Sequence, residues 1–316
     1  MTERPDYSVI IPVYNSGAWL PELVGRIARA MTGLGKPFEI LLVNDASPDR
    51  STWPAIQKIA EEEPSVRGFD MLYNVGQFRA LLCGFEHARG SLLVTMDDDL
   101  QHPPEEIPKL IQALEAHPEM DCVMGLYKNK QHGPLRNVGS ELVQKVMDVL
   151  YDKPNDIKTS SFRVLRKEVA EIAVLYRTAS PQLGPLIVRI TRKIMNVPVV
   201  HHPRVRGKSG YGLRTLARET LRSVVNASLA PLRLVSGIGM FFALASFVYG
   251  AVLIVYRLMG DIKVAGYTSL IVAIAFFSGM ILFSIGILGE YIGRIINEIT
   301  GMPRYTIRTQ TRETKP

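Results

Sequence analysis

Short apolar runs alternate with amphipathic segments along residues 7–116 of the chain. The apolar runs are rich in residues that favour strands, and the segments between them follow the helical period. This alternation predicts an α/β fold with a mostly parallel, twisted sheet that helices cover on both faces. The expected strands are 7–13, 38–43, 66–72 and 91–96, and the expected helices are 19–30, 51–62, 78–87 and 105–116.

Two uncharged stretches near the C-terminus are much longer than these runs. No charge occurs in the 23 residues between Arg233 and Arg257 or in the 26 between Lys263 and Glu290. Each stretch can cross about 30 Å of hydrocarbon as a helix. Buried core helices are the alternative, but globular helices of this length almost always show a polar face. We therefore expect a tight hairpin of two transmembrane helices, at about 234–257 and 264–289.

Basic residues flank this hairpin on both sides. By the positive-inside rule, the N-terminal domain and both termini lie on the cytoplasmic side of the inner (plasma) membrane, in a multi-pass topology. Residues 212–232 carry basic residues at helical spacing, which favours an amphipathic helix on the bilayer; an ordinary surface helix is the alternative. The flanking residues are Arg214, Arg218, Arg222 and Arg233 before the hairpin, and Arg294, Arg304 and Arg308 after it.

The chain is thus expected to have four parts. A soluble domain covers 1–211, the juxtamembrane helix 212–232, the membrane hairpin 233–295 and a cytoplasmic tail 296–316. The composition agrees with this division, because 21% charged and 47% hydrophobic residues is what a soluble domain averaged with an apolar segment would give. The membrane helices are also candidates for contacts between copies of the chain.

The net charge of +7 indicates an anionic partner, which can be nucleic acid, an acidic membrane surface or a phosphorylated substrate. The basic residues concentrate around the hairpin and form no patch interleaved with aromatic residues, so we expect no nucleic acid. Only Cys83 and Cys122 occur, without the spacing of a metal site or a disulfide framework, which favours a reducing compartment.

Each expected strand is followed by a polar cluster. In open parallel sheets, ligands bind beyond the carboxyl ends of the strands, so these clusters are expected to converge on one site. They are 14–16, 44–49, 74–79 and 97–101.

The last cluster contains three consecutive aspartates at the mouth of a strand. Alternation along the chain points Asp97 and Asp99 the same way, and Gln101 can add a carbonyl oxygen on that side. Oxygen ligands of this kind suit Mg²⁺ or Mn²⁺, which with open positions would bind a diphosphate. A solvated acidic turn is the alternative. Asp45, after the second strand, can accept hydrogen bonds from a base edge or form a local Asx-turn.

Several motifs occur in order and resemble those of family 2 glycosyltransferases with the GT-A fold, in particular the polyprenyl-phosphate glycosyltransferases. That group contains dolichyl-phosphate mannose synthases and bacterial undecaprenyl-phosphate sugar transferases. The resemblance covers nearly the whole chain. Its motifs are SVIIPVYN at 8–15, LLVNDASPD at 41–49, NVGQFRALLCGF at 74–85, MDDDLQHPPEEIP at 96–108, PVVHHPRVRGKSGYGLR at 198–214, PLRL at 231–234 and ILGEYIGRI at 287–295.

The resemblance implies a GT-A catalytic domain over 1–211 that transfers a sugar, with inversion and with Mg²⁺ or Mn²⁺, from a nucleotide sugar to a polyprenyl phosphate at the cytoplasmic membrane face. A UDP-sugar is the first donor to consider, and the product would serve cell-envelope glycan, lipid A or protein glycosylation. The implied metal ligands are Asp97, Asp99 and Gln101, and the implied nucleotide-binding residues are Pro12, Tyr14, Asn15, Asp45, Gly76, Gln77 and Asp98.

Three positions depart from the family pattern. Ser16 stands where the family usually has Glu, Gly210 where it often has Lys, and Ser161 where many members have a second Asp. The first departure bears on donor binding and the other two on the site for the acceptor.

A lipid phosphate is largely ionised at neutral pH, so it needs less help from a general base than a sugar hydroxyl does. The reaction needs cations instead, because donor and acceptor are both anions. The candidates are Arg163, Arg204, Arg206 and Lys208; for the last two, a solvated stretch facing anionic lipid headgroups is the alternative. Asp156 is the nearest candidate base, although its loop can be a simple solvated turn.

Two other functions share parts of this pattern. A processive membrane polysaccharide synthase would carry a Q-x-x-R-W signature, whereas the only tryptophans are Trp19 and Trp53. A non-catalytic membrane scaffold would show a degraded acidic cluster, whereas Asp97, Asp99 and Gln101 are all present.

Overall fold

The computed structural model describes residues 4–127, 157–176, 183–200, 266–299 and 303–311, with scattered positions between 237 and 259. The chain divides into two compact units. One comprises Met1–Arg214 together with Met302–Pro316, and the other comprises Thr215–Gly301. The boundary at residue 214 lies three residues beyond the end expected for the soluble domain.

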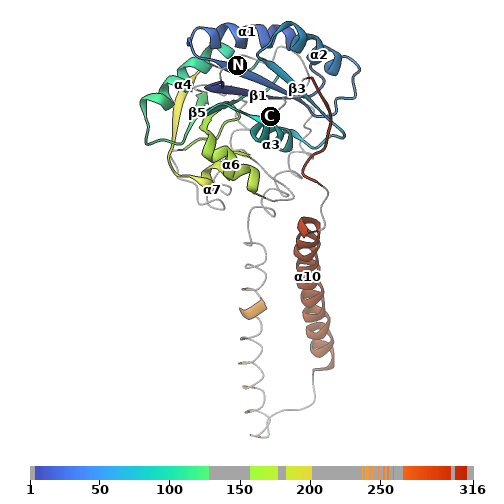
Figure 1. The fold of residues 1–316 in the computed structure, drawn as a ribbon. Helices are drawn as coiled ribbons and strands as arrows, with labels where there is room; N and C mark the ends of the chain where they lie inside the picture. The colour runs from blue at the N-terminus through green and yellow to red at the C-terminus, as the bar shows by residue number, and fades with distance from the viewer. Residues whose placement is uncertain are drawn as a thin grey trace. The chain divides into compact units, whose positions relative to one another are not determined.

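The first unit is built on one eight-stranded sheet with the order β7-β5-β6-β4-β1-β2-β3-β8 (Figure 1). The pairs β1·β2, β1·β4, β2·β3 and β5·β7 are parallel, and the other three are antiparallel, so the expectation of a mostly parallel sheet is confirmed. The strands are β1 (Tyr7–Val13), β2 (Phe38–Asn44), β3 (Val66–Met71), β4 (Leu92–Thr95), β5 (Cys122–Tyr127), β6 (Arg163–Arg166), β7 (Ile194–Val199) and β8 (Ile307–Gln310).

Helices cover both faces of this sheet, as Figure 1 shows. The first face packs against α1 (Leu20–Thr32), α2 (Thr52–Glu62) and α4 (Ile107–Ala116), which follows the short helix η1 (Pro104–Glu106). The second packs against α3 (Gln77–His87), α6 (Lys167–Leu175) and α7 (Leu183–Ile190).

Two apolar layers explain why the strands read as continuous hydrophobic runs. Every residue of β1 is buried; Val9 and Ile11 face the first layer, and Ile10 faces the second. Strands buried on both faces cannot alternate polar with apolar residues. The second layer is tightly packed: α3 lies so close to β1 at Gly84 that an added Cβ atom would be 2.2 Å from the Ile10 side chain. The sheet is therefore a rigid base for the turns at its carboxyl edge.

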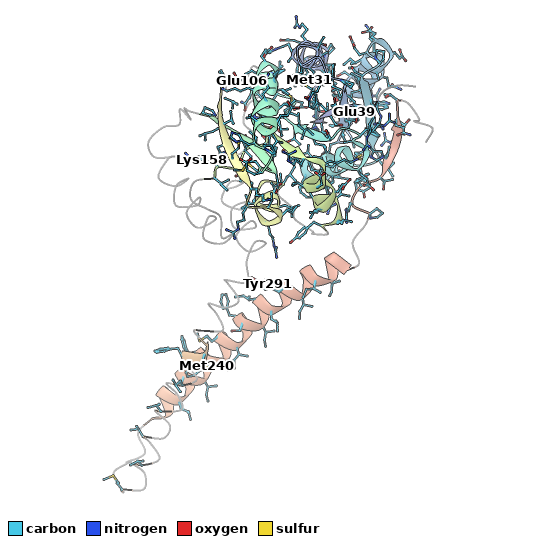
Figure 2. All side chains as sticks on the ribbon, turned by 60° about the vertical axis from the view of Figure 1, so that its left-hand side comes forward. Met31, Glu39, Glu106, Lys158, Met240 and Tyr291 are labelled. Atoms are coloured by element: carbon cyan, nitrogen blue, oxygen red, sulfur yellow. The ribbon has the colours of Figure 1, made fainter. Side chains whose placement is uncertain are left out.

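The second unit contains one long described helix, α10 (Tyr267–Ile299). It begins three residues after the expected start and continues ten residues beyond the expected end at 289, because charged residues end an apolar stretch without interrupting a helical backbone. Its window Phe276–Gly293 has a mean hydropathy of 1.5 and is long and apolar enough to cross a membrane. Its large side chains, such as Ile281 and Phe283, are exposed, whereas Met31 of α1 is fully buried. Figure 2 shows the Tyr291 side chain on α10 and the Met31 side chain in the first unit.

Most of the first expected span and the whole of 212–232 lie outside the described residues. The described positions from 237 to 255 are helical. That hairpin topology therefore stays a prediction.

The C-terminal segment differs from the tail expected over 296–316. Residues Ile307–Gln310 form β8, an edge strand antiparallel to β3 (Figure 1). Thr311 extends the contact, because its amide donates to the Gly68 carbonyl over 3.0 Å and its hydroxyl accepts the Gly68 amide at 2.9 Å. A four-residue strand with a partner more than 230 residues away leaves little local signal in the sequence.

Candidate functional site

The acidic turn follows β4 directly, at the carboxyl edge of the sheet. Asp97 receives two hydrogen bonds from distant segments: Gln77 Nε2 donates to Oδ1 (2.5 Å) and the Ser161 hydroxyl donates to Oδ2 (2.8 Å). His102, at the end of the turn, accepts from the Asp97 amide at 3.3 Å. Leu100 has a φ of +59°, so the turn adopts a left-handed conformation that is costly for leucine.

Asp98 faces the turn after β1. Its carboxylate accepts the Tyr14 amide at 2.9 Å and the Ser16 hydroxyl, and its carbonyl accepts Trp19 Nε1 at 2.7 Å. Burial raises the pKa of Asp98 to about 6, and the hydrogen bonds from Ser16 and Tyr14 oppose that rise. The serine at position 16 therefore supplies a donor to a partly buried carboxylate, which an ionised glutamate could not do.

The three residues expected to bind a metal, Asp97, Asp99 and Gln101, all lie in the acidic turn. Asp99 Oδ1 accepts the Gln101 amide at 3.1 Å, and His102 Nε2 lies 3.9 Å from Asp97 Oδ2. Among the residues that the structure describes, no group of three or more His, Cys, Asp or Glu side chains could hold a metal ion. The donor set is nevertheless oxygen-rich, which suits a hard cation whose remaining positions a substrate fills.

Asp45 binds the turn that leads into α3. Its two carboxylate oxygens accept the Val75 amide (2.6 Å) and the Gly76 amide (2.9 Å), and Gly76 has a φ of +83°. Burial raises the pKa of Asp45, and these two amides lower it in part. The local turn considered for Asp45 is made by its neighbour Asn44, whose Oδ1 accepts the Ser47 amide at 3.3 Å.

The turn after β1 adjoins the turn after β2. Pro12 pairs with Val43, and the Asn15 amide donates to the Ser47 hydroxyl at 2.9 Å. Asn15 has a φ of +57°, and its Oδ1 accepts the amide of Asp49 at 3.3 Å. The Tyr14 side chain is 49% exposed, so its ring can stack against a ligand.

The four polar clusters contact one another in a closed ring. The first meets the second through Asn15 and Ser47, and the second meets the third through Asp45 and Val75. The third meets the fourth where Gln77 binds Asp97, and Asp98 returns to Tyr14 of the first. The expected convergence of the clusters is therefore confirmed.

The candidate cations and the candidate base are only partly described. Arg163 lies on β6 opposite Thr95 of β4 and is 4% exposed, with its Nε 3.4 Å from the Ser161 carbonyl. It is thus close to the acidic turn but buried. Asp156, Arg204, Arg206 and Lys208 lie outside the described residues.

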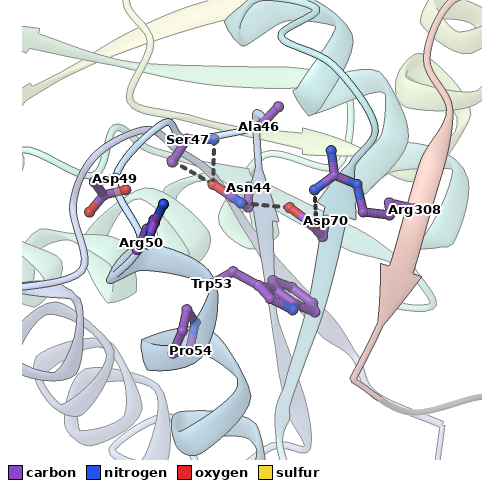
Figure 3. Close-up of a pocket in the computed structure, with 9 residues that line it drawn as sticks. All are labelled: Asn44, Ala46, Ser47, Asp49, Arg50, Trp53, Pro54, Asp70 and Arg308. Carbon is purple, nitrogen blue, oxygen red and sulfur yellow. Dashed lines mark hydrogen bonds and ion pairs between the residues drawn. The ribbon is translucent and has the colours of Figure 1, made fainter.

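Two side chains have contacts that were not expected from the sequence. Ser161 binds Asp97 from 64 residues away, and only its place in the Ser160-Ser161-Phe162-Arg163 segment could have suggested it. Arg308 lines a cavity of about 230 Å³ beside the turn after β2 (Figure 3). The cavity is also lined by Asn44, Ala46, Ser47, Asp49, Arg50, Trp53, Pro54 and Asp70.

Comparisons with known proteins agree with this geometry. The model of "Glycosyl transferase family 2" matches residues 8–172, and that of "GtrB C-terminal hairpin" matches residues 230–295. Two similar curated proteins are undecaprenyl-phosphate 4-deoxy-4-formamido-L-arabinose transferases. The one from Edwardsiella ictaluri is 35% identical over 98% of this chain and 95% of its own length. The one from Aeromonas hydrophila is 34% identical over 95% and 92%.

A solved structure shares the fold. Glucosyl-3-phosphoglycerate synthase from Mycobacterium tuberculosis, in complex with Mn²⁺, UDP-glucose and phosphoglyceric acid, has a TM-score of 0.51 to this chain. The match covers 72% of this chain and 79% of that one at 17% identity. At that identity the likeness shows the GT-A architecture alone.

Proposed function

Because this chain belongs to glycosyltransferase family 2, we propose that it transfers one sugar from a nucleotide diphosphate sugar to a polyprenyl phosphate of the undecaprenyl type. The ring of contacts among the four polar turns carries most weight, because it gathers carboxylates, backbone amides and an exposed aromatic ring at one edge of the sheet. These are the groups that a nucleotide, a diphosphate and a cation require.

The donor would lie along this edge. Tyr14 offers a ring for stacking, and Asn15 and Asp98 frame the turn after β1. The base contact expected of Asp45 requires its carboxylate to accept a further bond beside those from Val75 and Gly76, which its remaining lone pairs allow. Pro12, Gly76 and Gln77 complete the expected nucleotide site, with UDP as the first nucleotide to test.

Asp97, Asp99 and Gln101 would hold Mg²⁺ or Mn²⁺. Magnesium is commonly bound by one or two carboxylates together with waters and substrate phosphates, so a shell that the protein only begins suits a diphosphate donor. When bound, the cation would offset the charge that develops on the departing diphosphate. Gln77 and Ser161 would orient Asp97, because each donates to one of its oxygens.

The acceptor phosphate would attack the anomeric carbon directly. One of its oxygens forms the new C–O bond while the bond from the anomeric carbon to the donor diphosphate breaks, and the nucleoside diphosphate leaves with the electron pair. A single displacement inverts the anomeric configuration. Arg204, Arg206 and Lys208 would bind the acceptor phosphate, with Arg163 behind the site and Asp156 available as a base.

The proposed setting is the cytoplasmic face of the inner membrane. It is supported by the apolar window in α10, by the match of residues 230–295 to a C-terminal hairpin family and by the basic flanks. The chain would be multi-pass, with both termini in the cytoplasm. The bilayer would present the polyprenyl phosphate, and the helices could contact those of other copies.

A transfer assay tests the proposal. Full-length protein in detergent is given undecaprenyl phosphate, Mn²⁺ or Mg²⁺ and a panel of labelled UDP- and GDP-sugars; the nucleotide-linked form of 4-deoxy-4-formamido-L-arabinose comes first because of the relatives' names. We expect a chloroform-extractable lipid that carries a single sugar. Labelled polymer would favour a processive synthase, and no product with any donor would favour a scaffold. Turnover that survives EDTA and Asp99→Ala would refute the metal site.

A further inference from the structure

The C-terminal segment holds the turn between β3 and α3 from outside. The Thr306 carbonyl accepts the Leu72 amide at 2.8 Å, and Arg308 Nη2 donates to the Leu72 carbonyl at 2.9 Å. The Tyr73 hydroxyl donates to the Pro303 carbonyl at 3.1 Å. Both backbone groups of Leu72 are thus bound by residues that follow α10 in the chain.

That turn leads directly into the site. After Tyr73, the Asn74 side-chain amide donates to the Asp45 carbonyl at 3.1 Å. The backbone amides of Val75 and Gly76 then donate to the Asp45 carboxylate. Gln77 then reaches Asp97. A shift of Leu72 would therefore move donors of the third polar cluster, which bind Asp45 in the second cluster and Asp97 in the fourth.

A second path starts from the same guanidinium. Arg308 Nη1 lies 3.6 Å from Asp70 Oδ2, and Asp70 Oδ1 accepts Asn44 Nδ2 at 2.6 Å. Asn44 Oδ1 accepts the Ser47 hydroxyl at 2.5 Å, and that hydroxyl accepts the Asn15 amide at 2.9 Å. Figure 3 shows Arg308, Asp70, Asn44 and Ser47 in this sequence beside the cavity.

Asp70 is the buried link in this series of contacts between Arg308 and Asn15. Asp70 is 4% exposed, and its carboxylate has the Arg308 cation near one oxygen and an amide donor at the other. The path ends at Asn15, whose φ of +57° persists only if its surroundings hold it. A residue at the sheet edge is thereby linked to a strained turn at the site.

We propose that Arg308 is a positioning residue for donor binding, acting on the β3–α3 turn through Leu72 and on the β1 turn through Asp70, Asn44 and Ser47. This inference rests on the proposed function. Arg308 touches neither substrate nor cation; it sets the places of the groups that do.

Enzyme kinetics supply the first test, with Arg304 as the matched control. Arg304 lies in the same segment but donates to the Leu175 carbonyl at the end of α6, away from both paths. We expect Arg308→Gln to raise the donor KM about tenfold, in line with the loss of a charged hydrogen bond. The kcat, the acceptor KM and all constants of Arg304→Gln should stay near wild type. Equal effects of both variants would show that the segment only stabilises the fold, and would overturn the proposal.

A double-mutant cycle tests the second path. Ser47→Ala removes the acceptor of the Asn15 amide and should also raise the donor KM. If both residues act through one chain, the double variant with Arg308→Gln should show less than the product of the two single effects. If the double variant raised the donor KM by the product of the two single effects, the two residues would act independently, and the proposed path from Arg308 to Ser47 would be wrong. Should Arg308→Gln not fold, Asp70→Asn takes its place in the cycle, because it removes the charge that faces Arg308 and keeps an oxygen for Asn44.

Hydrogen exchange separates this inference from the proposed function. The amides of Val75 and Gly76 should exchange about tenfold faster in Arg308→Gln than in Arg304→Gln, because local opening of the turn becomes easier. This readout needs no turnover. Unchanged exchange refutes the positioning role even in an active enzyme, whereas faster exchange in a protein that transfers no sugar refutes only the proposed function.

Discussion

The polar clusters at the two ends of the same parallel strands differ in how their carboxylates are compensated. At the amino ends, Glu39 accepts Arg67 Nη1 (3.0 Å), the Ser8 hydroxyl (2.7 Å) and the Arg89 amide (2.7 Å), and the charges balance. At the carboxyl ends, Asp45 is buried and Asp98 is partly buried, and their carboxylates accept backbone amides and a hydroxyl.

The difference shows in charge and in backbone strain. Burial raises the pKa of both Asp45 and Asp98, as expected for carboxylates whose bonds come from neutral donors. The three non-glycine residues with positive φ, among those described, are Asn15, Ala46 and Leu100, and all lie in the carboxyl-end turns. Balanced charge is a structural feature, whereas uncompensated carboxylates on strained turns are suited to bind a cation and its ligand.

Neutralising one carboxylate at the carboxyl end should produce the largest effect on activity. We expect Asp97→Asn to lower transfer by more than about 100-fold, because it weakens a proposed metal ligand worth several kcal/mol. The melting temperature should change little, since the amide oxygen still accepts a hydrogen bond. Transfer assays and thermal melts on the same preparation check this. A large drop in melting temperature with normal turnover would show that Asp97 serves stability rather than activity, contrary to the comparison of the two strand ends.

The same chemical change at the amino end should act on stability. Glu39→Gln leaves the buried Arg67 cation unpaired, which costs about 3 kcal/mol of unfolding free energy. Denaturant unfolding of the variant measures this loss, and turnover per folded molecule should be unchanged. Glu39→Gln combined with Arg67→Met should recover part of the loss; no recovery would mean that the ion pair is not the cause.

The raised pKa of Asp45 predicts a pH effect. The folded state binds this proton more tightly than the unfolded state, whose value is near 3.8, so ionisation costs stability as the pH rises through the folded pKa. Asp45→Asn cannot ionise. The difference in melting temperature, variant minus wild type, should therefore become more positive from about pH 4 to pH 8. If this difference in melting temperature stayed constant or fell, Asp45 would not lie in an environment that disfavours its charge.

Removal of one hydroxyl should have the smallest effect. Ser16→Ala deletes the donor to Asp98 and should cost about 1 kcal/mol, seen as a melting temperature a few degrees lower. Ser16→Glu, which restores the family's usual residue, should cost more because it places a second carboxylate beside the partly buried one of Asp98. If glutamate were the better residue, the account of Ser16 as a donor to Asp98 would be wrong.

Much of the fold could be predicted because it depends on local pattern. The runs at 7–13 and 38–43 became β1 and β2 within one residue at each end, and the acidic turn lies where β4 ends. The α10 boundary was less predictable, since 289 marks the end of an uncharged stretch and the helix continues to Ile299. Charge pattern indicates where a membrane span ends, whereas backbone hydrogen bonds decide where a helix ends.

The residues of the site could be predicted from the sequence, but the residues that they contact could not. Tyr14, Asp45 and Asp97 could be selected from their places after strands, because the carboxyl ends of parallel strands meet. That Asp45 binds the turn before α3, that Arg163 is buried and that Ser161 binds Asp97 could not be read from spacing. Each depends on which side chains meet across the sheet.

The amino-acid sequence by itself determined the alternation that builds a parallel sheet, the polar turn after each strand and the uncharged stretches near the C-terminus. These are properties of neighbouring residues, so hydrophobic period and charge reveal them. Only the tertiary structure decided that Asp98 faces Ser16, that β8 returns to β3 and that Arg308 lies at the head of two paths into the site. The partners of those contacts are separated by 82 to 241 residues, and no local pattern records a contact that chain folding alone creates.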